Sequence, residues 1–303
     1  MNHRFTIVGF GEALFDLLPE GEKLGGAPLN VAAHAHQLAQ ARGGRGVIVS
    51  RVGQDDLGQR VYDELHERGM TTDFLQSDPD RPTGTVMVDL SGDEVSYDII
   101  EGVAWDVIQY DPDVEDLALH CDAVCYGTLA QRDAQSRNSL YRFLDAAKRA
   151  FKLYDVNLRP PYFEAGWVKR SCEYATGIKL NEDELPRVAE MVGVYEDDQD
   201  ARVRGLLKKF DLKLLVLTRG SRGTALITPD GNTVEGDMPD FAPGDNADPV
   251  GAGDSVSAAV LLGRVLRWPP ERTANVANHV GAYVAGQHGP TPTLPDHILD
   301  MVN

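Results

Sequence analysis

The chain has 303 residues, of which 42% are hydrophobic and 25% charged, a balance typical of soluble globular proteins. Asp and Glu total 47 against 29 Lys and Arg, and the net charge of −18 argues against nucleic acid or an anionic membrane as a partner. The three cysteines, an odd number, predict reduced thiols, and the chain lacks both a run of roughly 18 to 20 apolar residues and a signal-peptide core. We therefore expect a cytoplasmic protein.

Strand-like and helix-like segments alternate along most of the chain. Short apolar runs predict strands at 4–8, 46–53, 122–127, 151–157, 177–185 (leading into a helix) and 212–218, and a hairpin within 224–236. Apolar residues at helical spacing predict helices at 28–40, 55–70, 137–150, 255–266 and 271–286. Because strands that alternate with helices form a mainly parallel sheet covered on both faces, the sequence predicts an α/β fold in a single domain over 1–303.

Two segments fall outside this rhythm. The residues around Asp16 alternate like a second strand, and residues 83–100 predict a hairpin with its turn at 91–93. We expect the two to pair in a small separate β-sheet, formed by about 12–24 and 83–104.

Two glycine patterns associated with nucleotides are incomplete or absent. Gly9-Phe10-Gly11 begins a G-x-G-x-x-G pattern, but position 14 is Leu and the residues that follow lack helix character. This excludes the dinucleotide fingerprint and disfavours an oxidoreductase. The G-x-x-x-x-G-K-[ST] pattern of P-loop proteins is also missing from the sequence.

A glycine-rich turn precedes a small-residue apolar helix late in the chain. Gly251, Ala252 and Gly253 lead to the acid Asp254, and the free N–H groups and dipole of a helix start there would attract an anion. A carboxylate beside a phosphate is repelled, unless its task is to take a proton from a hydroxyl that attacks the phosphate. The alternative is that Asp254 only caps the helix, and this stretch alone does not separate the two hypotheses.

Polar residues also gather where the predicted strands end. Asn30 lies in the first turn of the helix that follows Gly25-Gly26, either as a ligand contact or as an ordinary helix-start residue. The polar residues and glycine at strand ends are Asp155, Asn157, Arg159, Asn181, Glu184, Thr218 and Gly220. Ligands of open α/β sheets bind at the carboxyl ends of the strands, which favours the catalytic hypothesis for Asp254.

Five segments are similar, in order and spacing, to the signatures of one family. They are residues 25–32 (GGAPLNVA), 157–160 (NLRP), 181–184 (NEDE), 218–220 (TRG) and 248–254 (DPVGAGD). Over most of its length the chain resembles the ribokinase-like, or PfkB-type, carbohydrate kinases, and within them the bacterial fructokinases. The resemblance implies a three-layer α/β sandwich with a mainly parallel sheet and a small β-sheet lid over the sugar, and a homodimer through that lid.

The resemblance also implies a role for each matching residue. Asp254 would be the base that deprotonates the sugar hydroxyl, in front of an anion hole made by Gly251, Ala252 and Gly253. The sugar would be bound by Asp16, Gly26, Ala27, Asn30 and Arg159. The nucleotide would be bound by Asn181, Thr218, Gly220, Gly223, Asn278 and Gly281, with Glu184 acting indirectly on Mg²⁺.

One residue departs from the family pattern. Position 249 is Pro where Thr is usual, and Pro has no N–H to donate within the loop. The family's K⁺ site would here use Asp248 and the carbonyl of Val250.

The sequence thus predicts an ATP- and Mg²⁺-dependent kinase that phosphorylates a primary hydroxyl of a neutral sugar, D-fructose. Ribose, a nucleoside and 2-keto-3-deoxygluconate are the alternatives within the fold. Kinases for the last sugar tend to carry an Arg just after the second lid strand, where this chain has Glu101 and no Arg. A non-catalytic sugar-binding regulator is the alternative of another class, against which the intact Asp254 and Glu184 argue.

Overall fold

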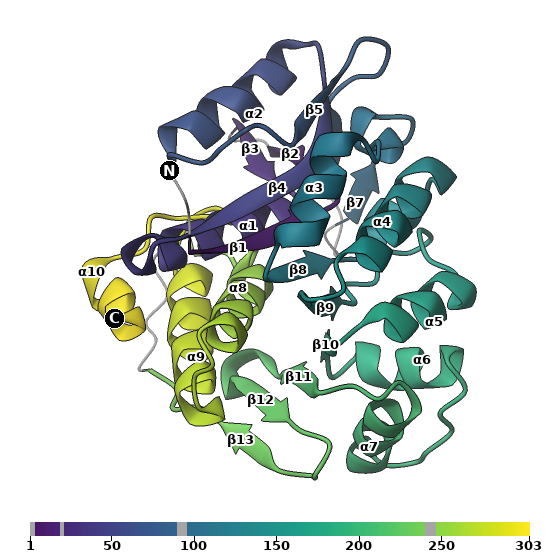
Figure 1. Cartoon of the computed structure of the whole chain (residues 1–303), viewed down its shortest axis with the longest axis vertical. Helices are drawn as coiled ribbons and strands as arrows, with labels where there is room; N and C mark the ends of the chain where they lie inside the picture. The colour runs from purple at the N-terminus through teal and green to yellow at the C-terminus, as the bar shows by residue number, and fades with distance from the viewer. Residues whose placement is uncertain (1–3, 19–20, 90–95, 240–246) are drawn as a thin grey trace.

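The computed structural model describes residues 4–18, 21–89, 96–239 and 247–303. Their largest sheet has the strand order β13-β12-β11-β10-β9-β8-β1-β4-β5 (Figure 1). The strands are β1 (Phe5–Phe10), β4 (Gly44–Gly53), β5 (Leu75–Asp78), β8 (Ala123–Tyr126), β9 (Phe151–Asp155), β10 (Gly177–Asn181), β11 (Leu214–Thr218), β12 (Thr224–Ile227) and β13 (Thr233–Glu235). From β5 to β11 every pairing is parallel, and β12 and β13 add an antiparallel hairpin at one edge.

Helices cover both faces of this sheet (Figure 1). One face packs against α3 (Pro112–His120), α4 (Ala134–Ala146), α5 (Ala165–Tyr174), α6 (Glu184–Met191) and α7 (Gln199–Lys209). The other face packs against α1 (Ala27–Ala39), α8 (Ala252–Val265), α9 (Pro270–Ala285) and α10 (Asp296–Leu299), with α2 (Asp56–Glu67) beside α1. The predicted α/β fold with a mainly parallel, two-sided sheet is therefore confirmed.

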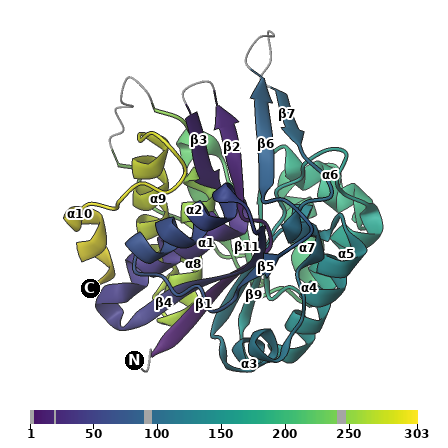
Figure 2. The same ribbon diagram turned by 90° about the horizontal axis from the view of Figure 1, so that it is seen from above.

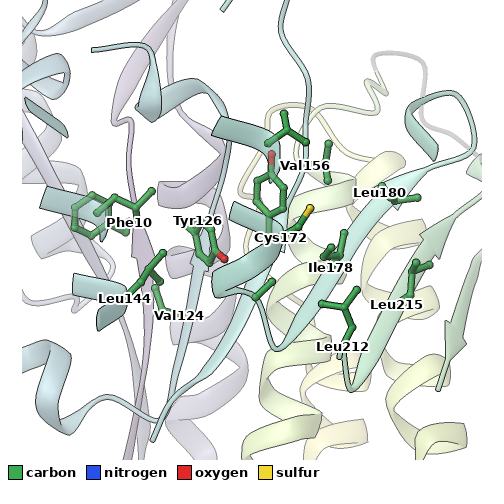
Figure 3. Packing of buried hydrophobic residues seen from close by; sticks show 14 of the residues in the cluster. Phe10, Val124, Tyr126, Leu144, Val156, Cys172, Ile178, Leu180, Leu212 and Leu215 are labelled. Atoms are coloured by element: carbon green, nitrogen blue, oxygen red, sulfur yellow. The ribbon is translucent and has the colours of Figure 1, made fainter. Parts of the chain in front are cut away.

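The core follows from the alternation of side chains along the strands. In β1, Val8 and Phe10 join the cluster under α3–α7, whereas Phe5 and Ile7 join the cluster under α1, α8 and α9. Figure 3 shows the first cluster, in which Tyr126 of β8 lies among side chains from the neighbouring strands and helices. Each large apolar side chain buried in this way stabilises the fold by roughly 1.5–3 kcal/mol.

A second, smaller sheet projects from the body (Figure 2). Its order is β3-β2-β6-β7, from β2 (Leu14–Leu18), β3 (Gly21–Gly25), β6 (Gly84–Asp89) and β7 (Ser96–Ile99). Its strands β2 and β3 leave the body directly after β1 and return directly into α1, so their base lies at the carboxyl end of β1. The predicted small sheet is confirmed; the turn predicted at 91–93 lies outside the described residues.

Several element boundaries differ from the sequence-based predictions. The helix predicted from 255 begins at Ala252, and the helix predicted to reach 150 ends at Ala146, because the chain must turn there to enter β9. The strand predicted over 177–185 ends at Asn181, whose side chain starts α6. The sequence analysis did not predict α3, α5, α7, β3 or β5.

Candidate active site

The N-terminus of α8 is open to an anion. Its N-cap is Gly251, in the left-handed conformation at φ 80°, and no side chain in the described part of the chain caps it. A Cβ on Gly251 would lie 2.1 Å from the carbonyl oxygen of Pro290, so only glycine fits at this turn. The N–H of Ala252 donates to the carbonyl of Pro249 at 3.2 Å, and the N–H groups of Gly253 and Asp254 remain available to a phosphate-like ligand.

Asp254 lies inside the first turn of α8 and does not occupy the cap position. Its Oδ2 accepts a hydrogen bond of 2.8 Å from Nδ2 of Asn30, in the first turn of α1. Burial, with the charge of nearby Asp155, raises the pKa of Asp254 to about 6, against the lowering effects of the Asn30 hydrogen bond and the Lys179 charge. Asp254 is therefore ionised at neutral pH, yet is a stronger base than an exposed carboxylate.

A buried ion pair lies beneath this turn. Lys179 on β10 donates to both carboxylate oxygens of Asp155 on β9, at 2.9 Å each, and Ser257 Oγ of α8 donates to the same carboxylate at 2.7 Å. Burial alone would lower the pKa of Lys179, but the charge and hydrogen bond of Asp155 together with the charges of Asp254 and Glu184 outweigh it, so the pKa is raised. The pair thus joins two strands to the start of α8, close to Asp254.

Asp16 and Arg159 face the same region. Burial raises the pKa of Asp16 on β2 to about 6, opposed by the charge of Arg159. Arg159, which is exposed, also lowers the pKa of Asp254, so its guanidinium acts on both carboxyls. A Cβ on Gly25 would lie 2.8 Å from Asp16 Oδ2, and one on Gly26 would lie 2.4 Å from a backbone oxygen. The two glycines therefore allow the chain to pack closely against Asp16 and the backbone of Glu12.

Glu12 was missed by the sequence analysis. It lies two residues beyond β1 and only 3% of it is exposed. Burial raises its pKa to about 7, and the Asp254 charge raises it while Arg159 and Arg132 lower it. The rule that pointed to Asp155 and Asn157, a polar residue at the carboxyl end of a parallel strand, also applies to Glu12.

Asn181 and Glu184 form a reciprocal capping box at the start of α6. Asn181 Oδ1 accepts from the N–H groups of Asp183 and Glu184, while Glu184 Oε2 accepts from the N–H of Asn181 at 3.0 Å. Glu184 Oε1 accepts in addition from the N–H of Leu158 at 2.8 Å. A carboxylate held by two amides keeps free lone pairs for water, so it fits an indirect role toward Mg²⁺.

The other residues predicted to bind the nucleotide lie at the ends of β11 and in α9. Gly220 has open space around it and φ +57°, which fits a surface that a ligand approaches closely. Gly223 (φ +74°) packs against Met238 and Asn278. Asn278 accepts from the N–H of Thr224 and donates to the carbonyl of Gly236, so its side chain joins β12 to the segment after β13.

The two remaining nucleotide candidates have structural contacts. Thr218 Oγ1 donates to the carbonyl of Leu180 at 3.4 Å. Gly281 allows α9 to approach Val256 of α8, since a Cβ there would lie 2.9 Å from Cγ2 of that residue. These contacts neither require nor exclude a nucleotide beside them.

The candidate K⁺ loop is ordered by Asp248. Asp248 Oδ1 accepts from the N–H of Val250 at 3.0 Å and Oδ2 from the N–H of Gly289 at 3.1 Å. Within the described residues, His, Cys, Asp and Glu nowhere form a group of three or more suited to a metal ion. A cation at this loop would accordingly depend on backbone carbonyls such as that of Val250.

The chain matches the family model of the pfkB family carbohydrate kinases over residues 20–297. The chain belongs to this family. Among its relatives in the pfkB family, the fructokinase of Klebsiella pneumoniae is 29% identical over 91% of this chain and 89% of its own length. The fructokinase of Escherichia coli is 27% identical over 94% of both chains.

Solved structures of sugar kinases share the fold. The ATP-bound fructokinase of Xylella fastidiosa has a TM-score of 0.82 at 23% identity, covering 98% of each chain. The 2-dehydro-3-deoxygluconokinase of Thermotoga maritima has a TM-score of 0.81 at 17% identity, covering 99% of this chain and 98% of that one. The family thus makes this chain a sugar kinase, and similar folds serve different sugars. None of the described helices is long and apolar enough to cross a membrane.

Proposed function

We propose that this pfkB kinase transfers the γ-phosphoryl group of ATP to a primary hydroxyl of D-fructose, with Mg²⁺ as cofactor. The observation that carries the proposal is Asp254, bound to Asn30 and placed inside the uncapped first turn of α8. Base and anion site then lie within one helical turn, as a hydroxyl attacking a phosphorus atom requires.

In this mechanism the residues of the chain position the reactants and move one proton. Asp254 accepts the proton of the attacking hydroxyl, and its pKa of about 6 makes it a better base than an ordinary carboxylate while leaving it ionised at neutral pH. The first-turn N–H groups of Gly253 and its neighbours stabilise charge on the transferring group. Mg²⁺, when bound near Glu184, would neutralise the ATP phosphates.

The charges around the sugar side favour a neutral substrate. Arg159 acts on all three of Glu12, Asp16 and Asp254, whereas the other cations near them, Arg132 and Lys179, are paired with Asp106 and Asp155. An acidic sugar would therefore add a negative charge to an acidic site. A neutral polyol fits better, because each of its hydroxyls donates to a carboxylate or accepts from an amide.

A second observation argues against 2-keto-3-deoxygluconate. Arg132 does reach the end of the second lid strand, where its Nη2 donates to the carbonyl of Ile100 at 2.6 Å. However, its side chain is only 6% exposed and is paired with Asp106. Its guanidinium also stacks on the rings of Trp105 and Tyr162, at 4.0 and 4.9 Å. The Arg132 guanidinium is therefore occupied by contacts within the protein and is not available to a substrate carboxylate.

The small sheet and the loop before α8 complete the proposal. We assign the sheet β3-β2-β6-β7 as a lid over the sugar, since Asp16 lies on it, and as the surface of a homodimer, to which the exposed Met87 of β6 would contribute. We also assign a K⁺ site to Asp248 and the carbonyl of Val250. A fructokinase structure from Vibrio cholerae, with a TM-score of 0.78, contains fructose, ADP and a potassium ion.

The test is an assay of ADP release from ATP with four acceptors side by side: D-fructose, D-ribose, 2-keto-3-deoxygluconate and adenosine. We expect the highest kcat/KM for fructose. If another acceptor is better, the assignment of fructose fails and that of a sugar kinase stands. If none of the four, nor a wider sugar panel, releases ADP, the chain is a binding protein and the proposed mechanism is wrong.

A further inference from the structure

Glu12 carries an unsatisfied acceptor in a nearly closed environment. Its side chain is 3% exposed, and its Oε2 has no hydrogen-bond partner among the residues described. A buried carboxyl oxygen without a partner is unfavourable by roughly 1–3 kcal/mol or more. Such a group points to a ligand that satisfies it.

Glu12 lines a recess at the carboxyl ends of β1, β8 and β9. The recess is small, with a cavity volume of about 10 Å³. Room of that size holds about one water-sized group, so one hydroxyl fits. The wall is mostly apolar and includes, besides Glu12, Ala27, Thr128 and Asp155.

Other polar groups of this wall are already engaged. Thr128 Oγ1 is bound to the carbonyl of Val156 and to the hydroxyl of Tyr154. The carboxylate of Asp155 is occupied by Lys179 and Ser257. Glu12 thus differs from Thr128 and Asp155, because hydrogen-bonding capacity remains at its Oε2.

The recess adjoins the sugar-binding residues. The backbone oxygen of Glu12 lies where a Cβ of Gly26 would clash, at 2.4 Å, and Ala27 forms part of the wall. The charges of Asp254 and Arg159 both act on the Glu12 carboxyl. A hydroxyl held in the recess would therefore belong to a molecule that lies against Gly26.

We propose that Glu12 is a substrate-binding residue that selects the sugar, by forming a hydrogen bond with one hydroxyl that enters this recess. The proposal rests on the sugar kinase function proposed above and adds a contact that the sequence did not suggest. Because the recess admits one small group, a sugar that lacks the matching hydroxyl leaves Glu12 unpaired and is rejected.

The protonation chemistry of Glu12 suits this contact. With a pKa of about 7, raised by burial, the carboxyl is substantially protonated at neutral pH, and a neutral carboxyl both donates and accepts a hydrogen bond. A sugar hydroxyl also does both. The charged groups that act on it are Asp254, Arg159 and Arg132, and the net effect of the two arginines is to keep part of the population ionised.

The experiment compares Glu12→Gln and Glu12→Ala with the wild type on D-fructose and on a set of fructose analogues that each lack one hydroxyl. Against fructose we expect Glu12→Ala to raise KM about 10- to 100-fold, with the KM for ATP unchanged. Against one analogue the penalty should disappear, since that analogue lacks the partner of Glu12. Glu12→Gln, which keeps the size and hydrogen-bonding capacity, should fall between the wild type and Glu12→Ala.

Ser50→Ala is the matched control. Ser50 on β4 is fully buried and its Oγ also lacks a partner among the described residues, but it lies outside the recess. We expect this variant to leave the analogue pattern unchanged. Thermal unfolding of all variants shows whether each remains folded.

An equal loss by the Glu12 variants on every analogue would mean that Glu12 is structural and would overturn the proposal, as would unchanged KM values. The proposed function has a separate readout. If the wild type phosphorylates fructose but the Glu12 variants show no selectivity among the analogues, only this inference is contradicted. If the wild type phosphorylates no sugar, both the proposed function and the inference about Glu12 are contradicted.

Discussion

The proposed sugar side and the proposed nucleotide side of the candidate site hold their carboxyl groups in opposite ways. On the sugar side, burial raises the pKa of Asp254 to about 6 and that of Glu12 to about 7, and Glu12 Oε2 has no partner in the described structure. On the nucleotide side, both oxygens of Glu184 accept backbone N–H groups, from Leu158 and Asn181.

This difference separates carboxyl groups suited to binding and proton transfer from a carboxyl group that stabilises the fold. A carboxyl that is buried and incompletely hydrogen-bonded destabilises the fold, but it is a better base and binds hydroxyls more strongly. A carboxylate that completes a capping box stabilises the fold and is less available for proton transfer. We therefore expect variants on the sugar side to lose activity while keeping or gaining stability, and Glu184 variants to lose some of both.

Asp254→Asn should give the largest effect. Turnover should fall by roughly 10²- to 10⁴-fold, because an amide cannot accept the hydroxyl proton. The Asn oxygen can still accept from Asn30 and Gly251 still holds the N-cap, and the amide removes a carboxyl whose pKa is raised in the folded protein, so the unfolding temperature at neutral pH should be at or above that of the wild type. Steady-state kinetics with thermal unfolding of the same sample checks both, and a kcat near the wild-type value would show that Asp254 is not the base.

Glu12→Gln should make the folded protein more stable at high pH. A carboxyl whose pKa is about 7 in the folded protein and about 4.5 in the unfolded chain favours folding when protonated, so stability falls as the pH rises from about 4.5 to 7. The amide does not ionise, so at pH 8 the variant should be more stable by on the order of 3 kcal/mol, and near pH 4 the two should be similar. Urea unfolding at both pH values measures this, and a variant less stable at pH 8 would show that Glu12 is well satisfied in the folded state.

The activity should depend on pH through Asp254. Since its pKa is about 6, kcat should fall about tenfold per pH unit below that value, where the base is protonated, and be flat above it. The kcat/KM profile should be steeper on the acid side, because Asp16, with a pKa also raised to about 6, would lose its charge in the same range. The acid limb of kcat should be absent from the residual activity of Asp254→Asn; a limb that persists there belongs to another group.

Glu184→Gln should have a smaller effect on two properties. An amide offers one oxygen in place of two, so one of the N–H groups of Leu158 and Asn181 loses its acceptor, and stability should fall by about 1–2 kcal/mol. The Mg²⁺ concentration for half-maximal activity should rise far more than the sugar KM. Glu182→Gln is the control, since Glu182 pairs with Arg222 at the surface and should change stability by about 0.5 kcal/mol or less.

The sequence predicted what depends on local pattern. The alternation of strands and helices predicted the sheet, and the glycines before Asp254 predicted a helix beginning close to them. Both predictions follow from short-range sterics and periodicity. The boundary of α8 was placed too late because Gly251 to Asp254 look like a loop, whereas the left-handed Gly251 allows the helix to start at once. The short amphipathic helices α3, α5 and α7 have weaker patterns and are stabilised by packing on the sheet.

Features that depend on contacts between distant segments of the chain could not be predicted from the sequence. That Asn30 binds Asp254, 224 residues away, and that Lys179 neutralises Asp155, depends on how the strand ends meet. The burial that shifts the pKa of Glu12 likewise arises only when α1 closes over β1. The resemblance to a family supplied roles for particular positions, and Glu12 was not among them.

The central claim is that Asp254 is the reactive carboxyl of the proposed sugar side and that Glu184 is a supporting carboxyl of the proposed nucleotide side. A Mg²⁺ titration of a variant of each residue tests it. The activity of Asp254→Asn and Glu184→Gln is measured at saturating ATP and sugar while Mg²⁺ is raised well above the ATP concentration. We predict that Glu184→Gln recovers most of the wild-type kcat, because excess metal compensates for weaker binding, and that Asp254→Asn stays low at every concentration, because no metal replaces the missing base. Recovery of Asp254→Asn, or a Glu184→Gln curve that stays as flat and low, would contradict the account.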